Sequence, residues 1–200
     1  MKRIVSMLLI ALLMLATLAG CGSGGGGNLA PIAKEDLKVA FLYVGPVGDL
    51  GYSYAHDQGR LALEEMGIST TYVENVPETS ECEATLRQLC DEGYNVIYAT
   101  SFGHGEWVEK VAKDYPNVYF GHATGYIQSA NTENYMGRAY EARYLAGIVA
   151  AMNSESGKIG YVAAMQIPEV IRGITAFTLV VRSVNPEATD EVIWTNTWYD

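Results

Sequence analysis

The sequence predicts an α/β fold in which parallel strands alternate with helices that cover both faces of a sheet. Short β-rich runs alternate with stretches of helical periodicity from residue 38 onward. The first run, residues 39–44, is apolar throughout, as expected of a parallel strand buried on both faces. Elements that alternate at this spacing form right-handed crossovers, which make neighbouring strands parallel.

The first series of elements spans residues 38–133, which we expect to form one N-terminal α/β lobe. We expect its strands at residues 39–44, 70–73, 96–99 and 118–120. The first helix follows an apolar stripe and ends at Gly67, a residue typical of helix C-termini. The residues of that stripe are Ala55, Gly59, Ala62, Leu63 and Met66.

The second helix of this lobe is predicted to begin at a capping box formed by Ser80 and Glu83. Behind it, Cys82, Leu86, Leu89 and Cys90 form an apolar stripe. The two cysteines lie eight residues apart, roughly 12 Å along a helix, whereas bridged Cα atoms lie within about 7 Å. We therefore expect buried thiols. A third helix, striped from Val108 to Tyr115, closes before Pro116.

A second series of elements occupies residues 134–200. It comprises a helix striped by apolar residues, a strand, a helix that Pro168 opens and that runs to about Val184, and a last strand. The stripe consists of Tyr140, Tyr144, Leu145, Ile148, Val149 and Met152, and the strands are residues 159–163 and 192–195. Two strands and two helices cannot close a covered sheet, so we expect only the start of a truncated C-terminal lobe.

The N-terminus reads as an export signal. Lys2 and Arg3 precede the apolar run 4–18, which is too short to span a bilayer, since roughly 20 residues are needed. The run ends in Leu-Ala-Gly-Cys21, which resembles a bacterial lipobox and implies a signal peptide of residues 1–20 and a diacylglyceryl group on Cys21. Residues 21–37 read as a flexible tether. The alternative is a plain secretory signal with an incidental Cys21.

The charge of the chain argues against nucleic acid as a partner. The formal charge is −10, and removal of Lys2 and Arg3 with the signal peptide changes it to −12. Nucleic-acid surfaces require clusters of Lys and Arg instead. The lipid anchor predicts a protein held on the extracytoplasmic face of a cell membrane, periplasmic or extracellular.

Five loops at the carboxyl ends of predicted strands are the candidate binding region, because ligands of open parallel sheets bind there. They are rich in aromatic rings and hydroxyl groups, with a few carboxylates, a mixture that suits a flat, neutral ligand with polar edges. The loops are residues 45–54, 100–104, 121–126, 165–168 and 196–200.

Other chemistries find little support in these loops. The glycines at 45, 48 and 51 lack the G-x-G-x-x-G spacing of dinucleotide sites. His104 and His122 follow neighbouring strands but have no third metal ligand at suitable spacing. Ser101 lacks the G-x-S-x-G frame of a nucleophile. Asp49 is equally compatible with a helix cap and with a ligand contact.

Several motifs together resemble one known family. Gly48-Asp-Leu-Gly-Tyr-Ser53 follows the first strand, and Tyr144-Leu-Ala-Gly-Ile148 and Lys158-Ile-Gly-Tyr-Val162 occur later. This combination resembles the basic membrane protein (BMP) family of ABC-transporter substrate-binding lipoproteins over residues 38–200. Its second lobe continues beyond residue 200.

The resemblance implies a periplasmic-binding-protein type I fold, two lobes joined by three crossings that close on a purine base or nucleoside. It places Asp49 at the edge of the ligand, Tyr52 in a stack on the base, and Trp198 as a candidate second ring. Ser101 and Phe102 match the contact loop after the third strand. The family has an aspartate after the fourth strand, where this chain offers His122 or Thr124, so a free base such as adenine is at least as well supported as a nucleoside.

Three hypotheses for function follow. The first is a monomeric transport receptor that delivers its ligand to an ABC permease and its ATPase, without cofactor, metal or catalytic residue. The second is an enzyme acting on purine nucleosides, with Asp49 or His122 as acid or base. The third is a surface sensor or adhesin that uses the same fold.

Overall fold

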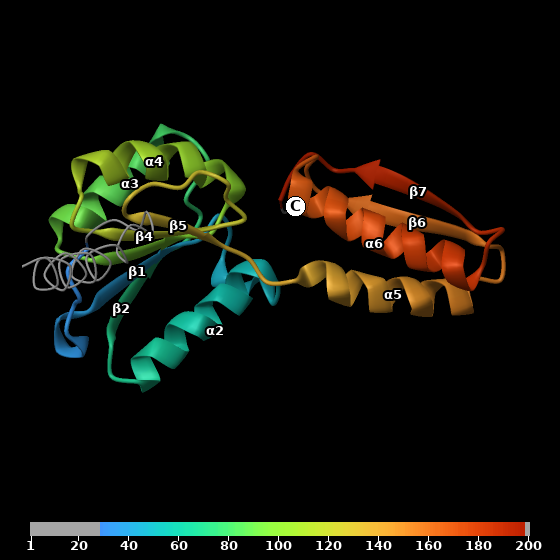
Figure 1. The fold of residues 1–200 in the computed structure, drawn as a ribbon, viewed down its shortest axis with the longest axis horizontal. Coiled ribbons are helices and arrows are strands. Elements are labelled where there is room, and N and C mark those ends of the chain that lie inside the picture. The colour runs from blue at the N-terminus through green and yellow to red at the C-terminus, as the bar shows by residue number, and fades with distance from the viewer. Residues whose placement is uncertain (1–28, 199–200) are drawn as a thin grey trace, which may run out of the picture.

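The computed structural model describes residues 29–198, which form two α/β lobes linked by residues 136–138 (Figure 1). The predicted signal peptide, Cys21 and the first part of the tether lie outside the described residues. In the described part of the chain, no helix is both long and apolar enough to span a bilayer.

The first lobe is built on a five-stranded parallel sheet with the strand order β2-β1-β3-β4-β5. Its strands are β1 (Lys38–Leu42), β2 (Ser69–Val73), β3 (Val96–Ala99), β4 (Tyr119–Ala123) and β5 (Thr132–Tyr135). The parallel α/β sheet predicted from the sequence is confirmed. Strand β5 was not predicted, because Thr-Glu-Asn-Tyr is polar and the strand lies at the edge of the sheet.

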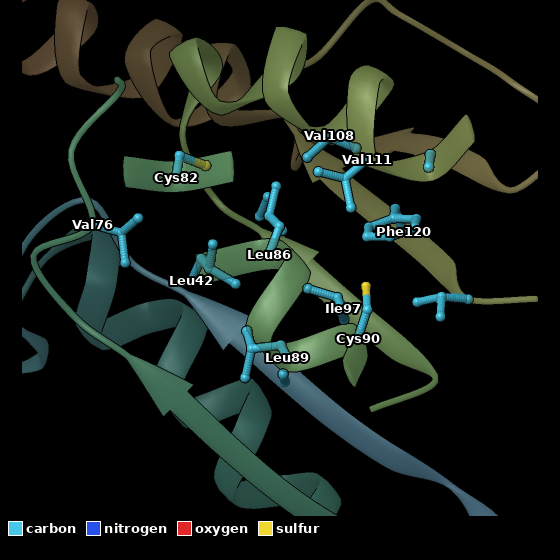
Figure 2. Close-up of a cluster of buried hydrophobic side chains, with 14 residues drawn as sticks. Leu42, Val76, Cys82, Leu86, Leu89, Cys90, Ile97, Val108, Val111 and Phe120 are labelled. Carbon is cyan, nitrogen blue, oxygen red and sulfur yellow. The ribbon is translucent and has the colours of Figure 1, made fainter. Parts of the chain in front are cut away.

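Helices cover both faces of this sheet: α2 lies on one face, and α3 and α4 lie on the other (Figure 1). Their bounds are Tyr52–Glu65, Ser80–Asp91 and Gly105–Asp114. The larger core fills the face below α3 and α4, where Leu86, Ile97 and Phe120 are fully buried (Figure 2). Cys82 and Cys90 belong to this core as free thiols, which confirms the expectation.

The start of α3 differs from the predicted capping box. The N-cap is Thr79, whose hydroxyl accepts a hydrogen bond from the backbone N–H of Glu81 at 3.4 Å. Glu83 does not reach back to the cap; its carboxylate binds Arg87 and Lys110 instead. The capping-box prediction was therefore wrong by one residue, because the adjacent Thr79 and Ser80 both have side chains suited to capping.

The buried face of α2 is polar, contrary to the predicted apolar stripe. Ala55 and Ala62 are exposed, whereas Asp57 and Arg60 are buried against the sheet. Arg60 Nε lies 2.6 Å from Asp57 Oδ1, which also accepts a hydrogen bond from the Tyr43 hydroxyl at 3.2 Å. A buried ion pair with a hydrogen-bonding partner takes the place of apolar packing, and hydrophobic periodicity cannot reveal such a face.

The second lobe consists of α5 (Ala139–Asn153), β6 (Lys158–Ala163), α6 (Pro168–Val184) and β7 (Thr189–Trp194). Strands β6 and β7 pair in parallel, and Pro168 opens α6 as predicted. The apolar stripe predicted for α5 is wrong as a buried face, because Leu145 and Met152 are 64% and 73% exposed. The buried residues of this helix are Gly147 and Ala151.

The contact between α5 and α6 depends on the absence of a side chain at Gly147. A Cβ atom there would lie 2.5 Å from Val180 Cγ1 and 2.8 Å from the Phe177 carbonyl oxygen. The two helices therefore approach more closely than any larger residue would permit, which explains why the seam runs through small residues. Large apolar side chains of α5, such as Leu145 and Met152, are exposed instead.

We expect Gly147→Ala to lower the free energy of unfolding by about 1–2 kcal/mol, because overpacking costs more than the gain in helix propensity. The measurement is denaturant unfolding followed by circular dichroism. The matched control is Gly59→Ala in α2, where an added Cβ would meet nothing within 4 Å, so we expect it to stabilise the protein by about 0.5–1 kcal/mol. Stabilisation by both substitutions would contradict the close approach of α5 and α6.

Candidate functional site

A cleft of about 710 Å³ lies where the carboxyl end of the first sheet faces the second lobe. The first lobe contributes the loops after β1, β3 and β4. The second lobe contributes residues of α5, β6 and α6 and the segment after β7. Six of the residues named from the sequence line this cleft: Asp49, Tyr52, Ser101, Phe102, Thr124 and Trp198.

Asp49 caps the first turn of α2 at the rim of the cleft. One carboxylate oxygen accepts the backbone N–H groups of Gly51 and Tyr54 at 2.8 and 3.0 Å, and the other accepts that of Ser53 at 3.0 Å. Partial burial raises the pKa of the Asp49 carboxyl, but these bonds outweigh it, and the pKa lies below its ordinary value. Asp49 is thus an anionic cap that also borders the site.

Tyr52 stands at the first position of α2 and is anchored across the sheet. Its hydroxyl donates to the carbonyl oxygen of Thr100 at 2.5 Å, and its ring lies 4.6 Å from the ring of His56. Burial raises the pKa of the Tyr52 hydroxyl, so it remains a donor. Tyr52 is 37% exposed and lines the cleft.

Ser101 and Phe102 follow β3 at the start of a short 3-10 helix, η3 (Phe102–His104). The Ser101 hydroxyl donates to Glu78 Oε1 at 2.5 Å, so its proton is directed away from the cleft. The ring of Phe102 lies 5.8 Å from that of Tyr126 and adds a second aromatic surface to the same lobe.

Thr124 adopts a strained backbone conformation where β4 ends. Its φ of 62° is unusual for a β-branched residue, and such strain is concentrated at functional sites. Its Oγ1 is buried and has no hydrogen-bond partner in the described structure. Thr124 lines the cleft, but its hydroxyl oxygen is buried, so a ligand would reach this oxygen only after a movement of the loop.

His122 does not line the cleft, contrary to the placement expected from its position after β4. It is buried beneath the loop, and its Nε2 lies 2.7 Å from the carbonyl oxygen of Ser101. Since a carbonyl only accepts, Nε2 carries the hydrogen. Burial lowers the pKa of the imidazole, which is therefore neutral. His122 supports the Ser101 loop rather than contacting the cleft.

Trp198 reaches the cleft from the second lobe. Its indole Nε1–H donates to Glu78 Oε1 of the first lobe at 3.1 Å. Tyr52 and Trp198 thus line one cleft from opposite lobes, the arrangement that a flat ligand held between two rings requires.

Residues of the second lobe that the sequence reading did not name also line the cleft. They include Arg143 on α5 and Glu169 and Arg172 in the first turns of α6. Burial raises the pKa of the Glu169 carboxyl, and the two nearby arginines oppose this shift without cancelling it. The sequence could have indicated Glu169 and Arg172, since the first turns of a helix that follows a strand face the same edge as the loop. The predicted loop ended at Pro168 and therefore left them out.

The histidines near the cleft are structural. His104 is fully buried, and its Nε2 lies 3.1 Å from the carbonyl oxygen of Val76. Between residues 29 and 198, no three His, Cys, Asp or Glu side chains are grouped as metal ligands. The geometry therefore describes a binding cleft of rings, hydroxyls and a few charges.

Two parallel α/β lobes around such a cleft define a periplasmic-binding-protein type I solute-binding protein. Solved structures of that class agree: a solute-binding protein of an ABC transporter system from Aeropyrum pernix K1 is 28% identical, with a TM-score of 0.66 over 80% of this chain and 47% of its own. Another, from Conexibacter woesei, has a TM-score of 0.61 over 82% of this chain and 56% of its own. Its sequence identity of 21% supports a shared fold alone.

Within that class, the chain belongs to the Bmp family, described as ABC transporter substrate-binding protein PnrA-like, which matches residues 36–200. The resemblance inferred from the sequence motifs is thereby confirmed. The family is described as one of ABC transporter substrate-binding proteins, and the two solved structures named above are solute-binding proteins.

Curated relatives carry different ligand names. A purine-binding protein of Brucella abortus is 43% identical over 94% of this chain and 53% of its own length. A putative ABC transporter glucose-binding protein of Haloferax volcanii is 47% identical over 88% of this chain and 44% of its own length. A nucleoside-binding protein of Lactococcus lactis is 23% identical over 100% and 58%. The chain spans about half the length of these relatives.

We expect Asp49→Ala to lower the free energy of unfolding by about 1 kcal/mol at neutral pH, because the three N–H groups lose their acceptor. The native pKa of Asp49 lies below the unfolded value of about 3.9, so this contribution is complete above that pH and is lost as the pH falls through the native pKa. Denaturant titrations of both proteins across this range provide the measurement. Asp49→Asn, which retains one acceptor oxygen, is the control and should lose less; a pH-independent difference would rule out the carboxylate cap.

Proposed function

We propose that this protein is the substrate-binding component of an ABC importer and that it captures a purine base or nucleoside between its lobes. The observation that carries the proposal is the pairing of Tyr52 and Trp198, which line one cleft of about 710 Å³ from opposite lobes. Clefts of roughly 300–1,000 Å³ hold small molecules of this kind. The names of the Brucella and Lactococcus relatives support the same ligand class.

The polar groups of the cleft support a free base such as adenine at least as well as a nucleoside. Thr124 offers a neutral hydroxyl without a protein partner where the family pattern has an aspartate. Asp49, whose carboxylate already accepts three backbone donors, would border the ligand edge. Phe102 and Ser101 would complete the wall on that side.

Glucose is the second candidate ligand, because one relative is named as a putative glucose-binding protein. Aromatic faces and carboxylates such as Glu169 also suit a sugar. The two ligands require different features of the cleft, since a purine stacks best between aromatic rings on both of its faces.

Binding would be coupled to transport by closure of the lobes on the ligand and docking on a membrane permease that an ATPase drives. The predicted boundary between residues 133 and 134 falls inside β5, so the lobes that the proposal brings together on a ligand are joined at residues 136–138 instead. The proposal also places the protein, as a monomer, on the extracytoplasmic face. Lipid on Cys21 would hold it near the permease and raise its effective concentration there.

Isothermal titration calorimetry of the purified protein with adenine, adenosine and glucose tests the ligand. We expect heat of binding with adenine or adenosine, and chromatography after incubation should recover the purine unchanged. Binding of glucose alone would contradict the proposed purine ligand. Cleavage of adenosine would contradict the proposed receptor function and favour an enzyme.

We expect Tyr52→Ala to weaken purine binding by about 1–3 kcal/mol, the scale of one lost base–aromatic stack. Tyr54→Ala is the matched control, since Tyr54 lies on the same helix, is also exposed and does not line the cleft. Tyr52→Phe, which keeps the ring, should retain most of the affinity. Equal affinities of the Ala variants would remove Tyr52 from the site.

A further inference from the structure

Glu78 collects hydrogen bonds from both lobes, although it does not line the cleft. It lies between β2 and α3 and is partly buried. Its Oε1 accepts three donors: the Ser101 hydroxyl at 2.5 Å, the backbone N–H of Gly103 at 2.8 Å and the indole N–H of Trp198 at 3.1 Å.

The first two bonds fix the loop after β3. They come from residues on either side of Phe102, whose ring lines the cleft. The loop approaches the carboxylate so closely that a Cβ at Gly103 would lie 2.5 Å from Glu78 Cδ. Glycine at this position is therefore what allows Glu78 to reach the loop.

The third bond crosses between the lobes. Trp198 follows β7, the last strand of the second lobe, and is 120 residues from Glu78 in sequence. In Figure 1 the chain that leaves β7 lies on the side of the second lobe that faces the first. This bond can form only while the lobes are close, whereas the bonds to Ser101 and Gly103 lie within one lobe.

We propose that Glu78 is a positioning residue that latches the two lobes and holds the indole of Trp198 at the cleft. Hydrogen bonds to an ionised acceptor are shorter and stronger than neutral ones, so a carboxylate is suited to this task. Glu78 would act through Trp198 and the Ser101–Gly103 loop without touching the ligand. The effect on purine affinity rests on the proposed function, but the effect on the lobes does not.

The latch is tested first without any ligand, by double electron–electron resonance between spin labels on Gln58→Cys in α2 and Arg182→Cys in α6, both exposed positions. Cys21 is replaced by serine. The thiols of Cys82 and Cys90 are buried, which raises the pKa of each to about 12, and they stay unlabelled.

We expect Glu78→Ala and Trp198→Phe each to shift the distance distribution toward longer distances, and the double variant to add nothing further. Glu78→Gln, which keeps an oxygen acceptor, should restore much of the short-distance population. Glu81→Ala, an exposed carboxylate nearby, is the control and should leave the distribution unchanged. Unchanged distances in Glu78→Ala would overturn the latch, whichever ligand the protein binds.

Adenine titrations of the unsubstituted protein, Glu78→Ala, Trp198→Phe and the double variant form a double-mutant cycle. We expect Glu78→Ala to weaken binding about tenfold, the scale of a lost bond to a charged group, and Trp198→Phe to cost less in the Glu78→Ala background than alone. Fully independent effects would contradict the coupling. If none of the four proteins binds adenine but the distances still shift, the proposed purine ligand is wrong and the proposed latch is supported.

Discussion

The parallel direction of the strands is the constraint on which the site depends. Because β1, β3 and β4 all run the same way, the loops that carry Asp49, Ser101 and Thr124 emerge at one edge of the sheet. Asp49 and Thr124, which are 75 positions apart in the sequence, thereby share one wall. In the second lobe, the carboxyl end of β6 and the first turns of α6 likewise face the cleft, which lies between this edge and the edge of the first sheet.

The side chains at this wall are held by bonds within the protein. Asp49 fixes the start of α2, and the hydroxyl of Tyr52 is tied to the backbone of Thr100. His122 supports the Ser101 carbonyl from below. Such anchoring leaves ring faces for a ligand and lowers the entropy lost on binding. This arrangement supports the proposed role of binding a solute.

Local patterns in the sequence were sufficient for the parallel sheet, for the buried stripe from Cys82 to Cys90 and for the opening of α6 at Pro168. They failed where burial did not follow hydrophobicity: α2 buries Asp57 and Arg60, and α5 buries Gly147 while it exposes Leu145. Strand-end position brought most of the candidate site together, but it misplaced His122, since the direction of a side chain depends on packing. Glu78 follows no strand end directly, and nothing in its local sequence indicates that its partner lies 120 residues away.

The central claim is that the cleft between the lobes holds a purine between rings supplied by both. A crystal structure of the protein grown with adenine tests it most directly. The account predicts electron density for the base in this cleft, with the rings of Tyr52 and Trp198 on its opposite faces and Thr124 Oγ1 within hydrogen-bonding distance of it. A base bound elsewhere on the protein, or a cleft that holds the base against one lobe alone, would contradict the account.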